Sequence, residues 1–268
     1  MSNGYLEHWM RENYDKTAEK YRRDDEIDAT GKDHDQLCSV LQDISSSFDA
    51  PVTVLDIGCG TGRHFHCLRN VRELVGIDVS QNMLEQAVHP VKKEEAPEHR
   101  KLICANFYNY DFAPGSFHFI YSIGVFGNGC ALTPELCAKL VRWLKPNGQL
   151  FFDVIDAGGL NFVLRSRKRM RSWIYRLLPS RLQEKWDKRT GWVPAFIITE
   201  PEIRKLLQKS GLEIVSVNRR LCDLPRGEGW KLQCRAVKRK ITAMATLGVL
   251  TFINPRTHSL LSAFEGSL

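Results

Sequence analysis

The sequence predicts an α/β fold built on a doubly wound, mostly parallel sheet. Short apolar runs typical of buried strands alternate with amphipathic helical segments along most of the 268 residues. Residues 117–123 are almost continuously apolar, as expected for a central parallel strand buried on both faces. A glycine-rich turn follows the first apolar run, at residues 52–57. A chain of this length can bury one sizeable core, so we expect one main domain.

The glycine turn predicts a ligand-binding floor. Gly58, Gly60 and Gly62 fall at alternate positions, and the sequence that follows predicts the first turns of a helix over residues 63–68. Glycine adopts backbone angles that side chains disfavour and lets a ligand lie against the main chain. The next strand, 74–77, precedes Asp78, whose carboxylate can accept hydrogen bonds from ribose hydroxyls. This arrangement indicates a nucleoside ligand.

The turn differs from the one that binds dinucleotides. That turn needs a third glycine where this chain has Arg63, because helix and strand must approach closely around a pyrophosphate. The alternate spacing instead leaves room for a ligand arm without a pyrophosphate.

Three segments together resemble the class I S-adenosylmethionine-dependent methyltransferases. They are VLDIGCGTG at 54–62, VGIDVS at 75–80 and LKPNGQLFFDV at 144–154. The resemblance implies a Rossmann-like, seven-stranded sheet, mostly parallel with an antiparallel last strand, plus a helical lid insertion. It also implies S-adenosyl-L-methionine as cofactor and S-adenosyl-L-homocysteine as product.

The resemblance further implies which residues contact the cofactor. Asn106 stands where relatives mostly carry an aspartate for the adenine amino group, and its amide oxygen can still accept that hydrogen bond. The following Phe107 is expected to pack on the ring. The full expected set is Tyr21, Asp56, Gly58, Cys59, Gly60, Gly62, Asp78, Val79, Met83, Asn106, Phe107, Ser122, Ile123 and Gly124.

Candidate catalytic residues are fewer, because an activated methyl group needs positioning more than acid-base chemistry. We expect Tyr14, Asn128 and Asp156 to reach the reaction chamber, with His64 as a further candidate base. His64 and His66 stand two apart on the expected helix, so they are not expected to share a face. Two interpretations of each remain open: an ordinary helical histidine, or a residue that acts as a base or metal ligand. No metal site is predicted.

The composition indicates the cellular compartment and the kinds of partner that this chain can have. The polar N-terminus lacks an apolar leader, and no apolar run is long enough to span a membrane, so a cytoplasmic protein is expected. None of the eight cysteines forms a Cys-x-x-Cys pair, and reduced thiols account for them. A formal net charge of +7 is compatible with an anionic partner, although solubility alone also tolerates it.

We divide the chain into five segments. Residues 1–33 form an N-terminal cap with a lead-in helix, and 34–157 form the cofactor-binding core. Residues 158–195 form a basic amphipathic lid insertion, 196–240 complete the sheet, and 241–268 form a C-terminal tail. The tail is expected either to dock on the domain or to lie at an interface.

The lid insertion leaves several interpretations open. Its clustered arginines and apolar residues suit a membrane surface, a polyanion, or a lid whose outer face is only solvated. If the polyanion were RNA, Trp173 and Tyr175 could stack on its bases.

The sequence thus predicts a methyltransferase acting on oxygen or nitrogen of a small-molecule or lipid-like acceptor, with possible contact to a membrane surface. An RNA methyltransferase that uses the basic insertion is one alternative. A non-catalytic scaffold that keeps the cofactor fold is the other.

Overall fold

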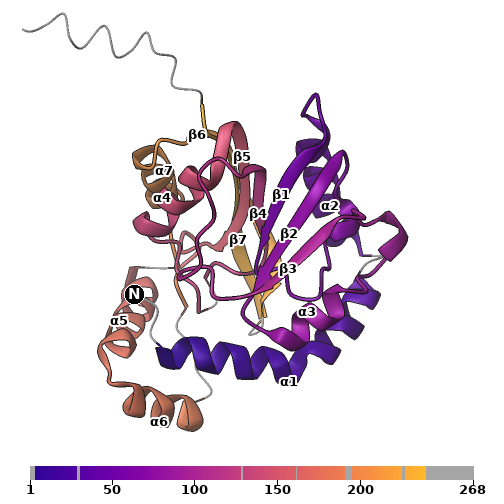
Figure 1. Cartoon of the computed structure of the whole chain (residues 1–268). Helices are drawn as coiled ribbons and strands as arrows, with labels where there is room; N and C mark the ends of the chain where they lie inside the picture. Colours follow the sequence, from indigo (N-terminus) through magenta and orange to yellow (C-terminus); the bar gives the residue numbers. More distant parts are fainter. Residues whose placement is uncertain are drawn as a thin grey trace, which may run out of the picture.

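The computed structural model describes residues 4–28, 31–127, 129–160, 162–190, 195–224 and 227–239. Seven strands form one sheet in the order β3-β2-β1-β4-β5-β7-β6, with helices around it (Figure 1). The C-terminal tail, 241–268, lies outside the described residues.

The strands pair as the sequence predicts. Neighbours among β1 to β5 are parallel, and β7 is antiparallel to both β5 and β6. The predicted class, a mostly parallel sheet whose last strand is antiparallel, is therefore confirmed. The strands are β1 Val52–Ile57, β2 Val71–Asp78, β3 Arg100–Cys104, β4 Phe117–Ser122, β5 Leu144–Ile155, β6 Glu213–Leu224 and β7 Gly227–Val237.

Helices α3 and α4 begin at capping side chains. Ser80 accepts a hydrogen bond from the Met83 backbone N–H at the start of α3, and Thr133 accepts one from the Leu136 N–H at the start of α4. The helices are α1 Gly4–Asp28, α2 Lys32–Ser46, α3 Gln81–Ala87, α4 Pro134–Trp143, α5 Phe162–Leu177, α6 Ser180–Thr190 and α7 Glu200–Lys209, with short 3-10 helices η1 Phe65–Cys67 and η2 Lys93–Glu95. None of these helices combines the length and the apolar character that crossing a bilayer requires.

One predicted element is wrong. The sequence predicts an α-helix after the glycine turn, over residues 63–68, but the structure has only η1 there, a single 3-10 turn. Residues of η1 are buried against α2, and Ser45 Oγ of α2 accepts a hydrogen bond of 2.9 Å from the Arg69 backbone N–H. Packing against α2 therefore takes precedence over local helix propensity.

The core lies on both faces of the central strands. All six residues of β1 are buried, and two apolar clusters pack on the sheet, one around Trp143 and Phe152, the other around Leu41 and Tyr121. The sheet order reverses at β1, which has β2 on one side and β4 on the other. Ligands of open α/β sheets bind at the carboxyl ends of the strands beside such a reversal.

Helix α1 crosses below the sheet at that end (Figure 1). The Asp15 carboxylate accepts hydrogen bonds from the Ser80 hydroxyl at 2.6 Å and from the Asn82 backbone N–H at 3.2 Å. These contacts hold α1 on the N-terminus of α3, immediately after β2. The lead-in helix therefore covers the place where a ligand is expected.

Candidate active site

A cavity of about 440 Å³ opens at the carboxyl ends of β1, β2 and β4. All but two of the residues expected to contact a cofactor line it, and the exceptions are Gly62 and Ser122. The Ser122 hydroxyl instead donates a hydrogen bond of 3.0 Å to the Ile57 carbonyl. The lining residues from the expected set are Tyr21, Asp56, Gly58, Cys59, Gly60, Asp78, Val79, Met83, Asn106, Phe107, Ile123 and Gly124.

The three glycines of the turn differ in what surrounds them. All have positive φ: +69° at Gly58, +52° at Gly60 and +77° at Gly62. A Cβ at Gly58 would lie 2.3 Å from Val125 Cγ2, and one at Gly62 would lie 2.7 Å from the Phe65 ring. A Cβ at Gly60 would meet no heavy atom within 4 Å. Gly58 and Gly62 therefore allow close packing within the protein, whereas Gly60 leaves open space beside the cavity.

Asp78 is fixed by backbone donors. Its Oδ2 accepts a hydrogen bond of 2.9 Å from the Gly60 N–H, and its Oδ1 accepts one of 3.0 Å from the Ser80 N–H. Burial raises the pKa of this carboxyl, while the hydrogen bonds from Ser80 and Gly60 oppose the rise. The carboxylate thus lines the cavity at the glycine turn, where a sugar hydroxyl can reach its remaining lone pairs.

Asp56, near the end of β1, lies deeper. It is 4 % exposed, and its burial, together with a smaller contribution from the charge of Asp78, raises its pKa to about 8. The side chain therefore carries a proton near neutral pH.

This protonation has a consequence for stability. The pKa of Asp56 is about 4 in the unfolded chain and about 8 in the folded chain. At pH values between these two, the folded chain binds more protons at Asp56 than the unfolded chain does. The contribution of Asp56 to the free energy of unfolding therefore falls as pH rises. We expect Asp56→Asn to remove a slope of at most about 1.4 kcal/mol per pH unit. Urea denaturation of both proteins at pH 5, 6, 7 and 8 measures this difference. Parallel pH profiles would show that Asp56 is ionised in the folded protein.

Helix α1 places aromatic and acidic side chains over the cavity. Tyr14 and Tyr21 both line it, with their ring centroids 6.0 Å apart in an edge arrangement. Asp25, which is 3 % exposed, accepts a hydrogen bond from the Thr61 hydroxyl and pairs with Arg63 at 3.6 Å. Burial raises the pKa of Tyr14, so its phenol keeps its proton near neutral pH. Its assignment as a base stays a prediction.

Asn106 and Phe107, which are expected to contact the adenine, both line the cavity. The Asn106 amide oxygen accepts a hydrogen bond of 2.9 Å from the Tyr108 N–H, and its amide nitrogen donates one of 2.7 Å to Glu7 of α1. One lone pair of the amide oxygen is left for a ligand. Phe107 packs against Tyr108 and Phe126, with ring centroids 4.5 Å and 6.2 Å away.

A buried ion pair completes the cavity wall, and sequence reasoning missed it. Asp153 of β5 is 2 % exposed, and its Oδ2 lies 2.7 Å from Lys231 Nζ of β7. Its Oδ1 accepts a hydrogen bond of 2.7 Å from the Gly124 N–H, just after β4. Because the partners are 78 residues apart, only the β5–β7 register could have revealed this pair.

The other predicted catalytic residues are placed differently. Asp156 does not line the cavity, because Arg219 pairs with its Oδ2 at 2.6 Å and the Gly158 N–H donates to its Oδ1 at 2.6 Å. Asn128 lies outside the described residues. His64 lines the cavity, and burial, with a smaller effect of Arg63, lowers its pKa well below 6.5.

Two expectations about histidines and cysteines are wrong. His64 and His66 both stack on His34 of α2, with ring centroids 5.5 Å and 5.0 Å away, because η1 lacks α-helical geometry. Cys38 and Cys67 are joined by a disulfide rather than being reduced thiols. Sequence reasoning could not foresee either contact, since each joins α2 to η1 across a long separation.

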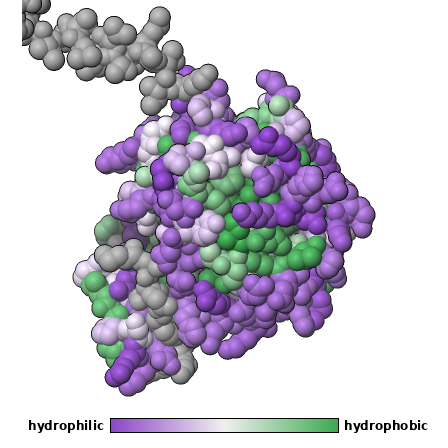
Figure 2. All heavy atoms as spheres, in the orientation of Figure 1, coloured by the Kyte–Doolittle hydropathy of each residue, from purple (hydrophilic) through white to green (hydrophobic). Residues whose placement is uncertain are grey.

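The lid insertion folds as α5 and α6. Tyr175 is buried, so the expectation that it could stack on an RNA base is wrong, whereas Trp173 is 61 % exposed. Figure 2 shows hydrophobic residues at the outer left edge of the molecule, over α5, among hydrophilic ones. The large apolar side chains exposed on α5 are Phe162, Val163, Leu164, Met170, Trp173, Ile174 and Leu177.

Comparisons with known proteins agree with this geometry. A family model described as a methyltransferase domain matches residues 54–148, which carry the glycine turn and Asp78. Among solved structures, magnesium protoporphyrin IX methyltransferase of Synechocystis, with S-adenosylhomocysteine bound, has a TM-score of 0.56 at 17% identity, covering 87% of this chain and 99% of that one. Residues 54–148 of this chain therefore match the methyltransferase-domain family, and the chain shares its fold with a solved methyltransferase.

Curated relatives of this methyltransferase domain have different tasks. The biotin biosynthesis bifunctional protein BioHC of Cellvibrio japonicus is 31% identical over 124 residues, covering 46% of this chain and 23% of that protein. A demethylmenaquinone methyltransferase of Leptospira interrogans is 30% identical over 166 residues, covering 56% of this chain and 61% of that protein. The chain thus spans less than two thirds of the length of either relative.

Proposed function

We propose that the chain transfers the methyl group of S-adenosylmethionine to an oxygen or nitrogen atom of a small-molecule or lipid-like acceptor. One observation carries the proposal: Asp78 is tied to the Gly60 N–H at 2.9 Å while both residues line the same cavity. The carboxylate, which could accept hydrogen bonds from ribose hydroxyls, therefore lies beside Gly60, where an added Cβ would meet no heavy atom within 4 Å.

Different lining residues would bind different parts of the cofactor and the acceptor. Asp78 would bind the sugar hydroxyls, and Asn106 and Phe107 would bind the adenine edge and face. Gly60 leaves the space in which the rest of the cofactor would lie against the turn. Beyond these residues, Asp153 and Lys231 line the wall that would face the acceptor.

Methyl transfer requires mainly that the acceptor atom be positioned against the methyl group. When bound, S-adenosylmethionine supplies a methyl group already activated on a sulfonium. The protein has to align the acceptor atom with it and exclude water, which can contribute about 7 to 11 kcal/mol of the barrier. Tyr14 and Tyr21 of α1 would exclude water, since both lie over the cavity. An amine acceptor would need no base, whereas a hydroxyl would benefit from one.

Calorimetric titration of the whole chain with S-adenosylmethionine tests the cofactor assignment. We expect saturable binding, with about tenfold or greater weakening in Asp78→Asn, because an amide keeps only one of the two acceptor oxygens. Asp111→Asn is the matched control, since Asp111 is an exposed aspartate outside the cavity lining. Absence of binding by the unaltered chain would contradict the proposal and favour a scaffold.

The side chains exposed on α5 support the proposal of a lipid-like acceptor. On a helical wheel its exposed Phe162, Met170, Trp173 and Leu177 fall within an arc of about 80°. Basic side chains flank this arc, and the helix contains no acidic residue. An apolar face between basic residues is the pattern of a helix that lies in an anionic lipid surface.

A second cavity lies between α5 and the segment that follows β4. It measures about 430 Å³ and is lined by Trp173 and Arg176 of α5 and by Phe126 and Gly127. Val125, the residue before Phe126, lines the cofactor cavity. The two cavities are therefore adjacent, and the second could receive the apolar part of an acceptor.

Vesicle binding measures the contribution of α5. We expect sedimentation with vesicles containing phosphatidylserine but much less with pure phosphatidylcholine. Arg167→Gln/Lys168→Gln should weaken this binding roughly 30-fold, because each basic residue near an anionic surface contributes about 1 kcal/mol.

Lys20→Gln/Arg23→Gln is the matched control, since it removes two exposed positive charges from α1 instead. Equal loss in both double variants would show that net charge, not α5, drives binding. Binding to RNA with a steep salt dependence and no vesicle binding would favour the nucleic-acid alternative.

A further inference from the structure

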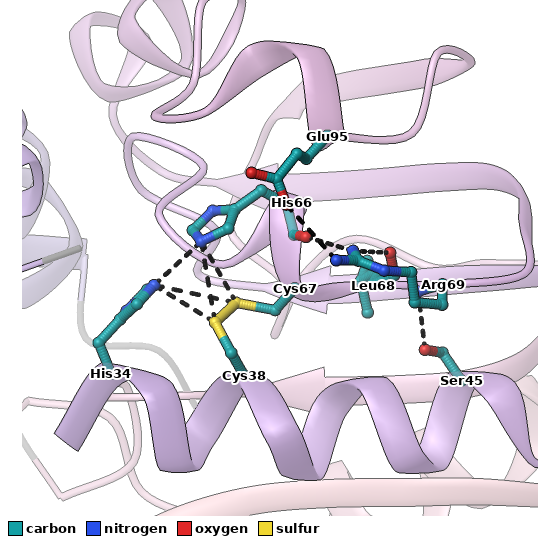
Figure 3. A network of polar contacts seen from close by, with 8 residues as sticks. All are labelled: His34, Cys38, Ser45, His66, Cys67, Leu68, Arg69 and Glu95. Carbon is teal, nitrogen blue, oxygen red and sulfur yellow. Dashed lines mark hydrogen bonds and ion pairs between the residues drawn. A yellow bond between two sulfur atoms is a disulfide. The ribbon is translucent and has the colours of Figure 1, made fainter. Parts of the chain in front are cut away.

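Four potential metal ligands meet between α2 and η1, beside the cofactor cavity. His34 and Cys38 stand one turn apart on α2 and face His66 and Cys67 of η1 (Figure 3). All four ligand atoms lie within 4.8 Å of one another. His34, His66 and Cys67 are each at most 3 % exposed, and Cys38 is half-buried. We propose that, with both cysteines reduced, these side chains form a structural Zn²⁺ site.

The distances fit tetrahedral zinc. With Zn–S bonds of about 2.3 Å and Zn–N bonds of about 2.0 Å, tetrahedral ligand atoms are about 3.3 to 3.8 Å apart. The two Nε2 atoms of His34 and His66 are 3.1 Å apart. Cys38 Sγ lies 3.3 Å and 3.8 Å from these nitrogens, and Cys67 Sγ lies 4.0 Å and 3.8 Å from them. Only the two sulfurs, which are bonded to each other here, would have to separate.

The disulfide alone does not account for the two imidazoles. It uses both sulfurs, yet both Nε2 atoms, which share one hydrogen bond with each other, also point at those sulfurs, which are weak hydrogen-bond partners (Figure 3). A zinc ion would use all four atoms at once. Two thiolates and two imidazoles form one of the commonest structural zinc sets, and this set leaves no open coordination position.

The disulfide and the zinc-bound form exclude each other, because both use the two cysteine sulfurs. Reduction of the Cys38–Cys67 bond by a dithiol or a phosphine consumes two electrons and two protons and gives two thiols. Binding of Zn²⁺ then releases both thiol protons, since thiolates are the ligands. The site would therefore hold either a disulfide or a zinc ion, according to the redox state.

The position explains what the ion would do. The helix expected after the glycine turn is only one 3-10 turn here, so fewer backbone hydrogen bonds fix this segment. A metal joining α2 to η1 would hold the segment that directly follows Gly62. His34 and His64 also line the cofactor cavity, so the clamp would support its wall.

Metal content of the full-length chain tests the site. The protein is reduced with a phosphine, stripped with a chelator, loaded with Zn²⁺ and measured by elemental analysis, and Co²⁺ replaces Zn²⁺ for absorption spectroscopy. We expect one zinc per chain and the intense visible absorption of tetrahedral thiolate-bound cobalt, lost on adding Zn²⁺. The oxidised protein, with its disulfide intact, should bind none.

Variants locate the ligands. Cys38→Ser and His34→Gln should each weaken zinc binding roughly 100-fold or more. Cys104→Ser and His99→Gln are matched controls, because both residues are exposed and lie outside the cluster. Should the ligand variants fail to fold, the cobalt spectrum of the unaltered chain still decides. Absence of a tetrahedral thiolate spectrum, or unchanged zinc binding in Cys38→Ser, would overturn the proposal whether or not S-adenosylmethionine binds.

Discussion

Replacing Gly60 by alanine is expected to raise the Kd for S-adenosylmethionine at least about 100-fold, equivalent to about 2.7 kcal/mol, while the chain remains folded. A Cβ at this position meets no protein atom within 4 Å, so the new methyl group would enter the cavity that Gly60 lines. The cofactor would have to move away from the turn and from Asp78. Calorimetric titration measures the Kd, and circular dichroism with urea denaturation measures folding.

The positive φ of Gly60 makes a matched control necessary. At φ +52° an alanine is strained by about 1 to 2 kcal/mol whatever surrounds it. Gly115 has φ +67°, also has no heavy atom within 4 Å of an added Cβ, and lies in the turn before β4, outside the cavity. Gly115→Ala should therefore lose similar stability and keep the affinity of the unaltered chain. Equal affinities in both variants would mean that no ligand lies against Gly60.

The parts of the fold that sequence reasoning predicted correctly depend on local patterns. The apolar run of Val52–Ile57 forms β1, and the nearly continuous apolar run at residues 117–123 forms β4. Each of these signals acts within a few residues, so it can be read without knowing the tertiary structure. The position of Asp78 at the end of β2 is equally local, since the acidic residue directly follows the apolar run of that strand.

The parts that could not be predicted depend on contacts between distant segments. His34 and His66 are 32 residues apart, and nothing in either segment alone indicates that they meet. The same contact accounts for the wrong helix after the glycine turn, because packing of η1 on α2 overrides the local preference. Asp156 was expected to reach the reaction chamber, yet Arg219 of β6 pairs with it instead.

The ion pair between Asp153 and Lys231 leads to the second prediction with a large effect. Lys231→Met should lower the free energy of unfolding by about 3 kcal/mol, because it leaves the buried Asp153 carboxylate without its cationic partner. The side chain of Asp153 is 3% exposed and that of Lys231 15%. The hydrogen bond from the Gly124 N–H remains, which places the loss at the lower end of the range for buried pairs. Urea denaturation at pH 7 measures the difference.

Two comparisons separate this effect from a general loss of charge. Arg23→Met removes a cation from an exposed pair with Glu19 on α1 and should cost less than about 1 kcal/mol. Asp153→Asn/Lys231→Met should recover part of the stability lost in Lys231→Met, since no buried charge is left unpaired. The asparagine oxygen can still accept the hydrogen bond from the Gly124 N–H, so the double variant removes the buried charge and keeps an acceptor there. If it were no more stable than Lys231→Met alone, an unpaired buried carboxylate would not account for the loss.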